Sequence, residues 1–266
     1  MIVDEPAAPA NGPVSGVRNL RDAGGIGALP TGVLYRSAAL DGLPPAGLRA
    51  LHSLGVRTVL DLRSAPELAA RPDALGTGAP FSGPLGAGSG IRHLHVPVFA
   101  EQRWPTEQAE LYPLMAELAG RPAAAAVRLL GSADGGAVLV HCASGKDRTG
   151  VVIALLQTLL GADEQEVLAD FLRSNTALGL TPEPAPTSNL APAPTPGSAV
   201  GPRTGGGGGG GGGHATRPVA AGHLRRALLS VRAQHGTVDA HLRAHGARPA
   251  ELAALRARFG PGPTAP

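Results

Sequence analysis

The chain has 266 residues, of which 43% are hydrophobic but only 3% aromatic, so aliphatic side chains must build its core. A formal net charge of +3 is too small to indicate a nucleic-acid-binding protein. A single cysteine, Cys142, excludes an intramolecular disulfide and a multi-cysteine metal site. The first residues lack the apolar region of a signal peptide, and no segment reaches the length of a membrane span. We therefore expect a cytoplasmic protein without a transmembrane segment.

The first half of the chain predicts alternating strands and helices after a disordered lead-in over residues 1–15. Leu48, Leu51 and Leu54 recur at helical spacing and indicate a helix that ends at Gly55. Short runs of alternating apolar residues indicate strands. The expected elements are a strand over Gly32–Arg36, a helix over Pro44–Leu54, a strand over Val56–Leu62, a Gly/Pro-rich loop over Gly76–Gly90 and a strand over Ile91–Val98.

The middle of the chain predicts four helices and one short apolar strand. Pro113 is unfavourable inside a helix, and Pro122 suits the first turn of a new one, so two helices are expected before the strand. The next helix is apolar all round and should be buried, and the last has a capping pair at Asp163 and Glu166. In order, the elements are helices from Thr106 to Leu118 and over Pro122–Leu130, the strand Ala137–His141, and helices over Gly150–Leu160 and from Asp163 to about Ser174.

Composition changes sharply over Thr181–Thr216, which is rich first in proline and then in glycine. Such a segment buries too little apolar surface to offset the entropy of ordering it, so we expect a flexible linker over 181–216. We assign 16–180 to the core, 217–260 to helices that complete the same domain, and 261–266 to a tail. The three C-terminal helices are expected from Leu224 to Gly236, from Thr237 to Gly246 and from Pro249 to Gly260.

The segment around the single cysteine carries the chemistry. Cys142 follows a buried strand, and Arg148 comes after five intervening residues, close to the start of a buried helix. The backbone N–H groups of such a loop can form an anion nest at a helix N-terminus. The helix dipole and Arg148 favour the thiolate of Cys142, and the guanidinium offers a planar fork for two phosphate oxygens. Thr149 can donate its hydroxyl to the sulfur as it leaves. The spacing predicts a thiolate nucleophile that attacks phosphate.

Two other interpretations of this segment fit less well. A nucleotide-binding P-loop needs glycine at position 140 and serine or threonine at 147, where the chain has Val140 and Asp147. A lone cysteine is usually a buried structural residue. The histidine before Cys142, the glycine within the loop and the arginine that closes it argue against that interpretation.

The sequence His141–Gly150 (HCASGKDRTG) resembles the signature HCxxGKDRTG of a bacterial family of tyrosine/serine phosphatases. The match covers most of the chain except the lead-in and Thr181–Thr216, where some family members carry helices that cover the active site. The resemblance implies an α/β fold of the cysteine-phosphatase type, with a central, mostly parallel sheet flanked by helices and a helical C-terminal segment. Further stretches resemble the family in the expected order: Asn19–Gly25, Leu34–Leu40, Leu60–Glu67, Ala169–Asn175 and the helices over Leu224–Phe259.

The resemblance also implies hydrolysis of phosphotyrosine through a phosphocysteine, with no metal or other cofactor. Some relatives act on phosphoinositides as well as phosphoprotein, so both are expected partners, whereas nucleic acid is not and the oligomeric state stays open. Lys146 suits a more highly charged head group or pairs with a nearby carboxylate. Besides Arg148, the residues expected to bind phosphate are Ala143, Ser144, Gly145, Lys146 and Thr149, with His141 in support.

Two aspartates compete for the role of general acid. Asp147 lies inside the loop, where myotubularin-like phosphatases place their acid. Asp61 ends a predicted strand, where parallel sheets present functional groups. Either residue has a structural alternative, Asp147 as a helix N-terminal carboxylate and Asp61 as a partner of Arg63. We favour Asp147, and we expect Arg21 and Asp22 to brace the loop without taking part in the chemistry.

Two further functions remain as alternatives to an active phosphatase. A phosphate-binding module without turnover is disfavoured because Cys142, Arg148 and Thr149 are all present. Sulfur transfer by a rhodanese-like loop is a poor fit to the run Asp147–Thr149 and to the flanking motifs. Release of phosphate from an aryl phosphate separates the three functions.

Overall fold

The computed structural model describes residues 14, 16–75, 90–100, 104–105, 107–132, 135–181 and 216–260. The domain boundaries drawn from the sequence stay predictions, because several of them fall elsewhere. Thr106 lies outside the described residues. So do nearly all residues of four segments discussed above, namely the lead-in, the Gly76–Gly90 loop, the 181–216 linker and the tail.

Strands and helices alternate along the chain from β2 to α4, and in the described part of the chain only helices follow. The strands are β1 (Arg21–Asp22), β2 (Leu34–Ser37), β3 (Val56–Asp61), β4 (Arg92–His95) and β5 (Ala137–His141). The helices are α1 (Pro45–Ser53), α2 (Ala65–Ala70), α3 (Gln108–Gly131), α4 (Asp147–Leu159), α5 (Glu164–Leu178), α7 (Ala221–His235), α8 (Val238–Ala244) and α9 (Pro249–Phe259). The sequence patterns predicted most of these elements and missed β1 and α2.

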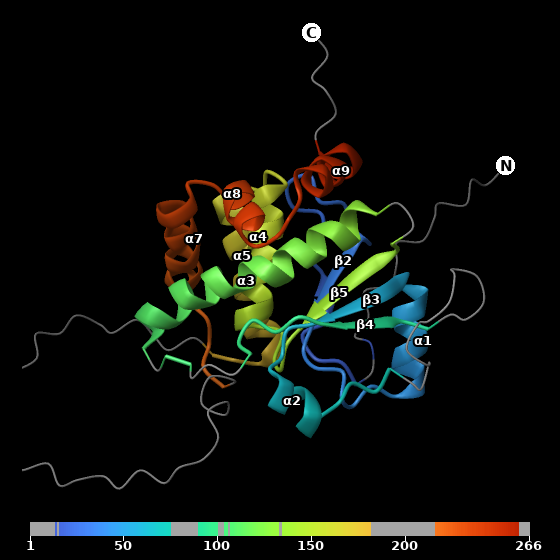
Figure 1. The fold of residues 1–266 in the computed structure, drawn as a ribbon. Helices are drawn as coiled ribbons and strands as arrows, with labels where there is room; N and C mark the ends of the chain where they lie inside the picture. The colour runs from blue at the N-terminus through green and yellow to red at the C-terminus, as the bar shows by residue number, and fades with distance from the viewer. Residues whose placement is uncertain are drawn as a thin grey trace, which may run out of the picture.

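The five strands form one sheet in the order β1-β2-β5-β3-β4 (Figure 1). β1 is antiparallel to β2, and the other neighbouring pairs are parallel. The carboxyl ends of the parallel strands therefore meet at one edge, where ligand sites form in such sheets. At that edge His141 is in register with Ser37 on one side and Asp61 on the other, and Asp61 with His95. The expected α/β fold, with its mostly parallel sheet and helical C-terminal segment, is confirmed.

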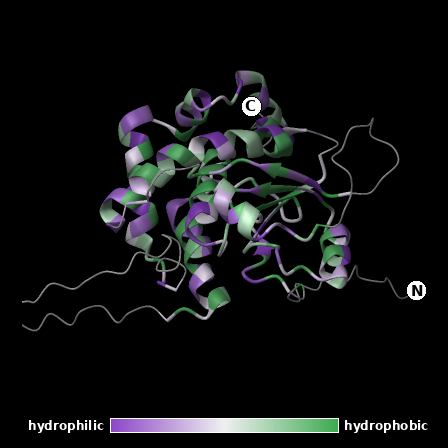
Figure 2. Cartoon of the chain, turned by 60° about the horizontal axis from the view of Figure 1, so that its bottom comes forward, coloured by the Kyte–Doolittle hydropathy of each residue, from purple (hydrophilic) through white to green (hydrophobic). Residues whose placement is uncertain are grey.

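Both faces of the sheet are covered, because successive side chains of a strand point to opposite faces. In β5, Val138 and Val140 belong to the larger core, which includes residues of α3 and α4. Ala137 and Leu139 belong to the smaller core, which includes Leu51 of α1. In Figure 1, α3 runs in front of α4 and α5, and α7, α8 and α9 gather on this side of the sheet. Hydrophobic residues concentrate at the centre of Figure 2.

The prediction of two helices between residues 106 and 130 is wrong, because α3 continues through both Pro113 and Pro122. A proline inside a helix costs about 3 kcal/mol or more through its missing N–H and its clash with the preceding turn. One stripe of α3 stays buried across both prolines and includes Met115, Ala119 and Val127. Packing of this stripe against α4, α7, α8 and α9 offsets the local cost.

The boundaries of α4 and α5 also differ from the expected ones. α4 begins at Asp147 rather than Gly150, so its first turn contains Asp147, Arg148 and Thr149. α5 extends to Leu178, where Gly179 ends it in the left-handed conformation at a φ of 66°. Within the described ranges, no helix combines the length and hydrophobicity needed to cross a bilayer.

Candidate active site

The cysteine loop joins the end of β5 to the start of α4 and lies at the carboxyl edge of the sheet. Cys142, its first residue, is only 2% exposed. Gly145 has a φ of +66°, and a Cβ at this position would overlap the carbonyl group of Ser37. Only glycine satisfies both constraints, so this residue lets the loop pass close to the neighbouring strand.

The carbonyl groups of the loop are turned outward, away from its centre. Four successive loop carbonyls accept hydrogen bonds from residues outside the loop. The bonds are Ala39 N to Ala143 O (3.2 Å), Asn19 Nδ2 to Ser144 O (3.0 Å) and Gly145 O (2.9 Å), and Arg36 Nη2 to Gly145 O (2.9 Å) and Lys146 O (3.3 Å). Because each peptide's N–H points away from its C=O, these bonds favour a loop whose N–H groups face inward as an anion nest.

Asn19 and Arg36 are themselves held by the first half of α5. Arg36 Nη1 donates to Asp170 Oδ2 at 2.7 Å, and Arg21 Nε donates to Asp170 Oδ1 at 3.0 Å. Arg21 also donates to the side-chain oxygen of Asn19. Burial alone would raise the pKa of Asp170, but the charges of Arg36 and Arg21 lower it. Arg21 therefore braces the loop as expected, through Asn19.

Asp22 has a different role from the one expected. Its carboxylate accepts hydrogen bonds from the backbone N–H groups of Gly24 (2.7 Å) and Gly32 (2.6 Å). These bonds hold the connection between β1 and β2. Asp22 thus shapes the segment next to the loop, and both of these hydrogen bonds are to residues outside the loop.

Arg148 closes the loop and is clamped by a carboxylate that sequence reasoning did not single out. Its Nη1 and Nη2 atoms donate to Glu67 Oε2 and Oε1 at 2.6 and 2.8 Å. A guanidinium has five N–H groups, so this bidentate pair leaves others for phosphate. Burial alone would lower the pKa of Arg148, but the charges of Cys142 and Glu67 raise it above its usual value. The guanidinium also lies 4.6 Å from the centre of the Trp104 ring.

Glu67 is positioned by the start of α2, directly after β3. It completes a capping box with Ser64, whose backbone N–H donates to Glu67 Oε2 at 2.8 Å. Burial alone would raise the pKa of Glu67, but its hydrogen bonds and ion pair with Arg148 lower it to about 2. The spacing Ser64-x-x-Glu67 after a strand is the sequence signal that could have revealed this residue.

Thr149 and Lys146 both lie in buried positions around the loop. Within the part of the chain that the structure describes, the Thr149 hydroxyl has no hydrogen-bond partner, so it is available for the sulfur of Cys142. Lys146 donates to the backbone carbonyl of Arg217, and its Nζ lies 3.6 Å from Asp147 Oδ2. Lys146 therefore shows the carboxylate pairing that the sequence left open.

Asp147 lies in the first turn of α4 with its side chain 17% exposed. Tyr112 of α3 donates its hydroxyl to Asp147 Oδ1 at 2.5 Å. Burial and the charge of Asp147 raise the pKa of Tyr112 well above its usual value, so the phenol keeps its proton. The Tyr112 ring stacks on His223 at 4.9 Å, which fixes the orientation of the donor. Sequence reasoning missed Tyr112 because its contact with Asp147 joins separate helices.

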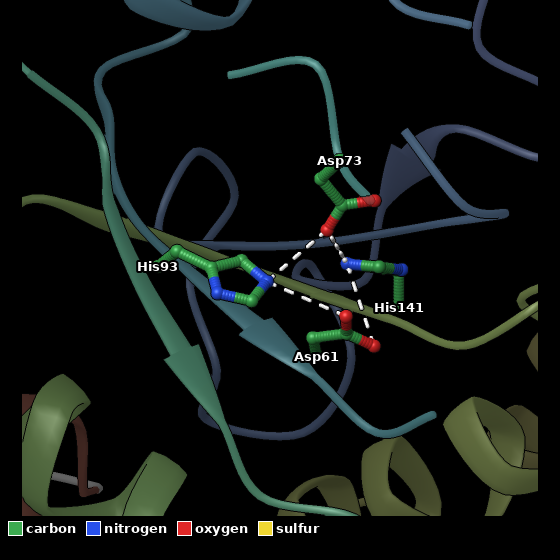
Figure 3. Close-up of side chains that lie close together, drawn as sticks. All are labelled: Asp61, Asp73, His93 and His141. Carbon is green, nitrogen blue, oxygen red and sulfur yellow. Dashed lines mark hydrogen bonds and ion pairs between the residues drawn. The ribbon is translucent and has the colours of Figure 1, made fainter. Parts of the chain in front are cut away.

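Asp61 occupies a different environment, at the end of β3 beside the strand end that carries His141 (Figure 3). Its side chain is fully buried and forms an ion pair with Arg63 at 2.7 Å, as the structural alternative predicted. Arg63 also contacts Asp73 at 2.9 Å. His93 Nε2 lies 3.4 Å from Asp61 and 3.2 Å from Asp73. His141 Nε2 lies 2.9 Å from Asp73 Oδ2, so this network contacts the residue that precedes Cys142.

We call Asp61, Arg63, Asp73, His93 and His141 the strand-end network. Burial alone would raise the pKa values of Asp61 and Asp73, but their hydrogen bonds to the neighbouring histidines and Arg63 hold them well below the usual range. Hydrogen bonds to the same two carboxylates raise the pKa of His93 to about 9. At neutral pH two carboxylates therefore face two cations, Arg63 and His93. The charges of the network therefore balance without an additional cation.

The structure brings the expected loop residues together around Cys142 and keeps Asp61 apart from them in the strand-end network. It adds residues that contact the loop or its flanks from outside, which come from the N-terminal segment, β2, α2 and the residues after it, α3 and α5. Those that sequence reasoning did not assign are Asn19, Arg36, Glu67, Asp73, Tyr112 and Asp170.

Comparison with known proteins places this geometry in context. A model of the tyrosine phosphatase family matches residues 12–260. Over 192 residues the chain is 33% identical to the triple specificity protein phosphatase PtpB of Mycobacterium tuberculosis, an alignment that covers 61% of this chain and 68% of the relative. Over 249 residues it is 28% identical to a tyrosine-protein phosphatase of Nostoc commune, covering 88% of this chain and 76% of that one.

Among solved structures, the core catalytic domain of the PP-IP phosphatase SIW14 from S. cerevisiae aligns with a TM-score of 0.35 and 17% identity. The alignment covers 59% of this chain and 75% of that chain.

Proposed function

The chain belongs to the tyrosine phosphatase family, as the resemblance of its cysteine loop indicated, and on that basis we propose that it hydrolyses phosphotyrosine monoesters through a phosphocysteine at Cys142. The observation that carries this proposal is the outward hydrogen bonding of four loop carbonyls around the buried cysteine, with Arg148 clamped by Glu67. This arrangement supports a nest of N–H donors and one guanidinium for the phosphoryl oxygens.

In the first step, the Cys142 thiolate attacks phosphorus and the bond from phosphorus to the leaving oxygen breaks. The leaving oxygen takes a proton from a general acid, and the phosphoryl group remains on sulfur. In the second step, water attacks phosphorus, the deprotonated acid takes a proton from the water, and the S–P bond breaks to release phosphate. Arg148 holds phosphoryl oxygens in both steps, and Thr149 donates a hydrogen bond to the departing sulfur.

We assign the general acid to Asp147 rather than Asp61. A general acid must carry a proton near the working pH and must reach the leaving group. Asp61 is fully buried, and its hydrogen bonds hold its pKa well below the usual range, so it lacks that proton. Asp147 is partly exposed beside the loop, and the Tyr112 hydroxyl orients its carboxylate.

The substrate range follows from the loop and from one relative. The relative in Mycobacterium tuberculosis bears the name triple specificity protein phosphatase. On that basis we include phosphoserine, phosphothreonine and phosphoinositide monoesters as secondary substrates. Lys146 does not carry this part of the proposal, because its Nζ is already held by the Arg217 carbonyl and lies 3.6 Å from Asp147 Oδ2.

The first experiment tests the nucleophile. Cys142→Ser should retain the fold but lose turnover of an aryl phosphate by more than about 100-fold, because a serine hydroxyl without an adjacent base is a poor nucleophile. Steady-state release of phosphate measures this loss, and circular dichroism checks the fold. Residual activity above that limit contradicts the phosphocysteine. If wild-type protein binds inorganic phosphate but does not hydrolyse the aryl phosphate, the result would instead support a binding module.

The second experiment tests the acid with two leaving groups. An alkyl oxygen needs a proton as it leaves far more than an aryl oxygen of low pKa does. Asp147→Asn should therefore lose much more activity on an alkyl phosphate than on an aryl phosphate. Asp61→Asn should lose similar activity on both and unfold at lower temperature. The exchanged pattern would assign the acid to Asp61, and equal losses in both variants would exclude both residues.

A further inference from the structure

A second group of ionisable side chains lies among the C-terminal helices, where no step of the proposed reaction uses it. We call Glu117, His235, His241 and His245 the histidine cluster. Glu117 comes from the middle of α3, His235 ends α7, His241 lies in α8, and His245 follows directly after α8. The ring centres of the three histidines lie 4.4 to 5.8 Å apart. Three imidazoles from separate turns of chain therefore surround one carboxylate.

The nitrogen atoms of the three rings converge on Glu117. His235 Nε2 lies 3.0 Å from Glu117 Oε2, and His245 Nε2 lies 3.3 Å from Oε1. His241 Nδ1 lies 3.9 Å from Oε2. With bonds of about 2.0–2.1 Å, the ligand atoms around a tetrahedral zinc ion lie about 3.3 Å apart. Glu117, His235 and His241 offer ligand atoms that all lie within 4.8 Å of one another, and His245 Nε2 would complete the set from the side of Glu117 Oε1.

His241 supplies an independent sign that a ligand is missing. The residue is fully buried, and among the described residues neither ring nitrogen forms a hydrogen bond of full geometry, although the ring interacts with the backbone of Ala116. Buried polar atoms normally have a partner, so such an atom requires an explanation.

The surroundings of His245 and His241 suit metal ligands as well. His245 Nδ1 lies 2.9 Å from the His241 carbonyl oxygen, which can only accept, so Nδ1 carries the proton. The other nitrogen, Nε2, faces Glu117 and is the ligand atom that the neutral ring would offer. A hydrogen bond from the second ring nitrogen is typical of metal-bound histidine, because it fixes the tautomer. A Cβ at position 120 would overlap the His245 ring, so Gly120 provides the space.

We propose that the histidine cluster binds one divalent transition-metal ion, with zinc the preferred one, through three imidazoles and one carboxylate. Neutral imidazole and carboxylate are ligands that zinc accepts in tetrahedral sites. The site would join α3, α7 and α8, and this cross-link between helices gives it a structural role. Glu117 is 36% exposed and His235 and His245 are each about a fifth exposed, which gives an ion a path from solvent.

The strand-end network is also a group of carboxylates and histidines, but it does not fit a metal in the same way. Arg63 contacts both of its carboxylates, and His93 is protonated at neutral pH. In the histidine cluster, the groups that act on Glu117 are the three histidines, and no guanidinium is among them. Among the described residues, the histidine cluster therefore offers ligands for a metal ion, and no arginine occupies the place that Arg63 takes in the strand-end network.

The test is zinc titration of the untagged full chain after chelation and dialysis. Calorimetry should give one zinc per chain with a dissociation constant below about 1 µM. The same titration in Cys142→Ser should be unchanged, which separates this site from the active-site thiol. His235→Asn and His245→Asn should each weaken binding by more than about 100-fold, because even residues outside the coordination shell contribute about 10–100-fold. His52→Asn, on α1, is the matched control and should bind as wild type does.

A second measurement tests the structural role. Zinc at about 100 times its dissociation constant should raise the Tm of wild-type protein by about 5 °C or more, and EDTA should reverse the shift. His235→Asn should show no shift. Initial rates on an aryl phosphate at 25 °C should be the same with and without EDTA, and the same in wild type and His235→Asn. The zinc measurement is therefore independent of the proposed reaction. Failure to bind, binding that persists in both histidine variants, or binding lost in Cys142→Ser would each overturn the proposal.

Discussion

The strand-end network and the histidine cluster contain the same kinds of side chain but differ in what balances their charge. The first holds two carboxylates against Arg63 and a protonated His93. The second holds one carboxylate against three imidazoles, of which His241 is fully buried and neutral. Carboxylate and histidine together therefore do not define a metal site. The presence or absence of a guanidinium from the chain itself decides which kind of cluster they form.

The two groups also differ in their access to water. Asp61, Arg63 and His141 have fully buried side chains, whereas Glu117 is 36% exposed. A buried ion pair that loses one partner leaves an uncompensated charge with no water to solvate it. A partly exposed carboxylate can exchange its partner for water or for an ion. The same type of substitution should therefore have very different effects in the two places.

The largest effect is expected from Arg63→Met. The variant removes the cation that contacts both Asp61 and Asp73, and breaking a buried pair in this way costs about 3–5 kcal/mol. Urea unfolding measures the free energy of unfolding. Arg57→Met, at an exposed position on the same strand, should change it by less than about 0.5 kcal/mol. A loss of less than about 1 kcal/mol in Arg63→Met would contradict the view that this network depends on its guanidinium.

The next largest effect is expected from Glu67→Gln, measured as kcat/KM on an aryl phosphate. The amide keeps the shape of Glu67 but loses the charge that orients Arg148, and small misplacement of a catalytic group costs about 100-fold, or about 2.7 kcal/mol. Because the pKa of Glu67 is about 2, its charge is constant from pH 4 to 8 and the variant should keep the pH profile of wild type. Glu117→Gln is the matched control and should retain full activity. Equal kinetics for Glu67→Gln and wild type would show that Arg148 is positioned without this carboxylate.

A smaller effect is expected from Glu117→Gln on stability in the presence of EDTA. Pairs between partly exposed groups contribute about 1 kcal/mol or less, so the free energy of unfolding should change by no more than that. With zinc present the difference from wild type should grow, since only wild type gains from ion binding. Urea unfolding under both conditions measures this. A large loss in EDTA would mean that the histidine cluster depends on its carboxylate as the strand-end network depends on Arg63.

The smallest effect is expected from the pH dependence of His93, whose side chain is 30% exposed. Its pKa is about 9 in the folded chain against about 6.5 when unfolded. The folded state therefore binds the extra proton, and the stabilisation is fully present below pH 6.5 and is lost as the pH rises through 9. Wild type should lose more stability than His93→Gln between pH 6.5 and 9.5. If the free energy of unfolding of the two proteins changes with pH in the same way, the network does not raise the pKa of His93.

The sequence predicted the cysteine loop well because all of its parts are adjacent in the chain. A short apolar strand, a loop with one glycine, and an apolar helix specify the geometry from residue 137 to residue 160. The error in α3 has the opposite origin. Pro122 is a local signal for a helix start, but packing of the buried stripe across it overrides the signal. Local patterns thus succeed where local forces dominate.

The partners of the loop could not be predicted because they depend on the order of the strands. Arg148 meets Glu67 only because β3 lies beside β5 in the sheet, and the pattern of either segment alone does not reveal that neighbour. The strand-end network likewise joins Asp61, Asp73 and His141 through the same pairing. The histidine cluster requires α7 and α8 to pack on α3 across the long segment 182–215, which gives no sequence signal of its own.

The outward hydrogen bonds of the loop also determine when a newly made chain becomes competent. Asn19 donates hydrogen bonds to the carbonyl oxygens of Ser144 and Gly145, which lie 125 and 126 residues further along the chain. Arg36 is held by Asp170. During translation, at about 5–20 residues per second, Cys142 leaves the ribosome before Asp170 does. A nascent chain that ends between them carries the thiol without the bracing that shapes its anion nest. We therefore expect catalytic competence to arise late in synthesis, after α5 has emerged.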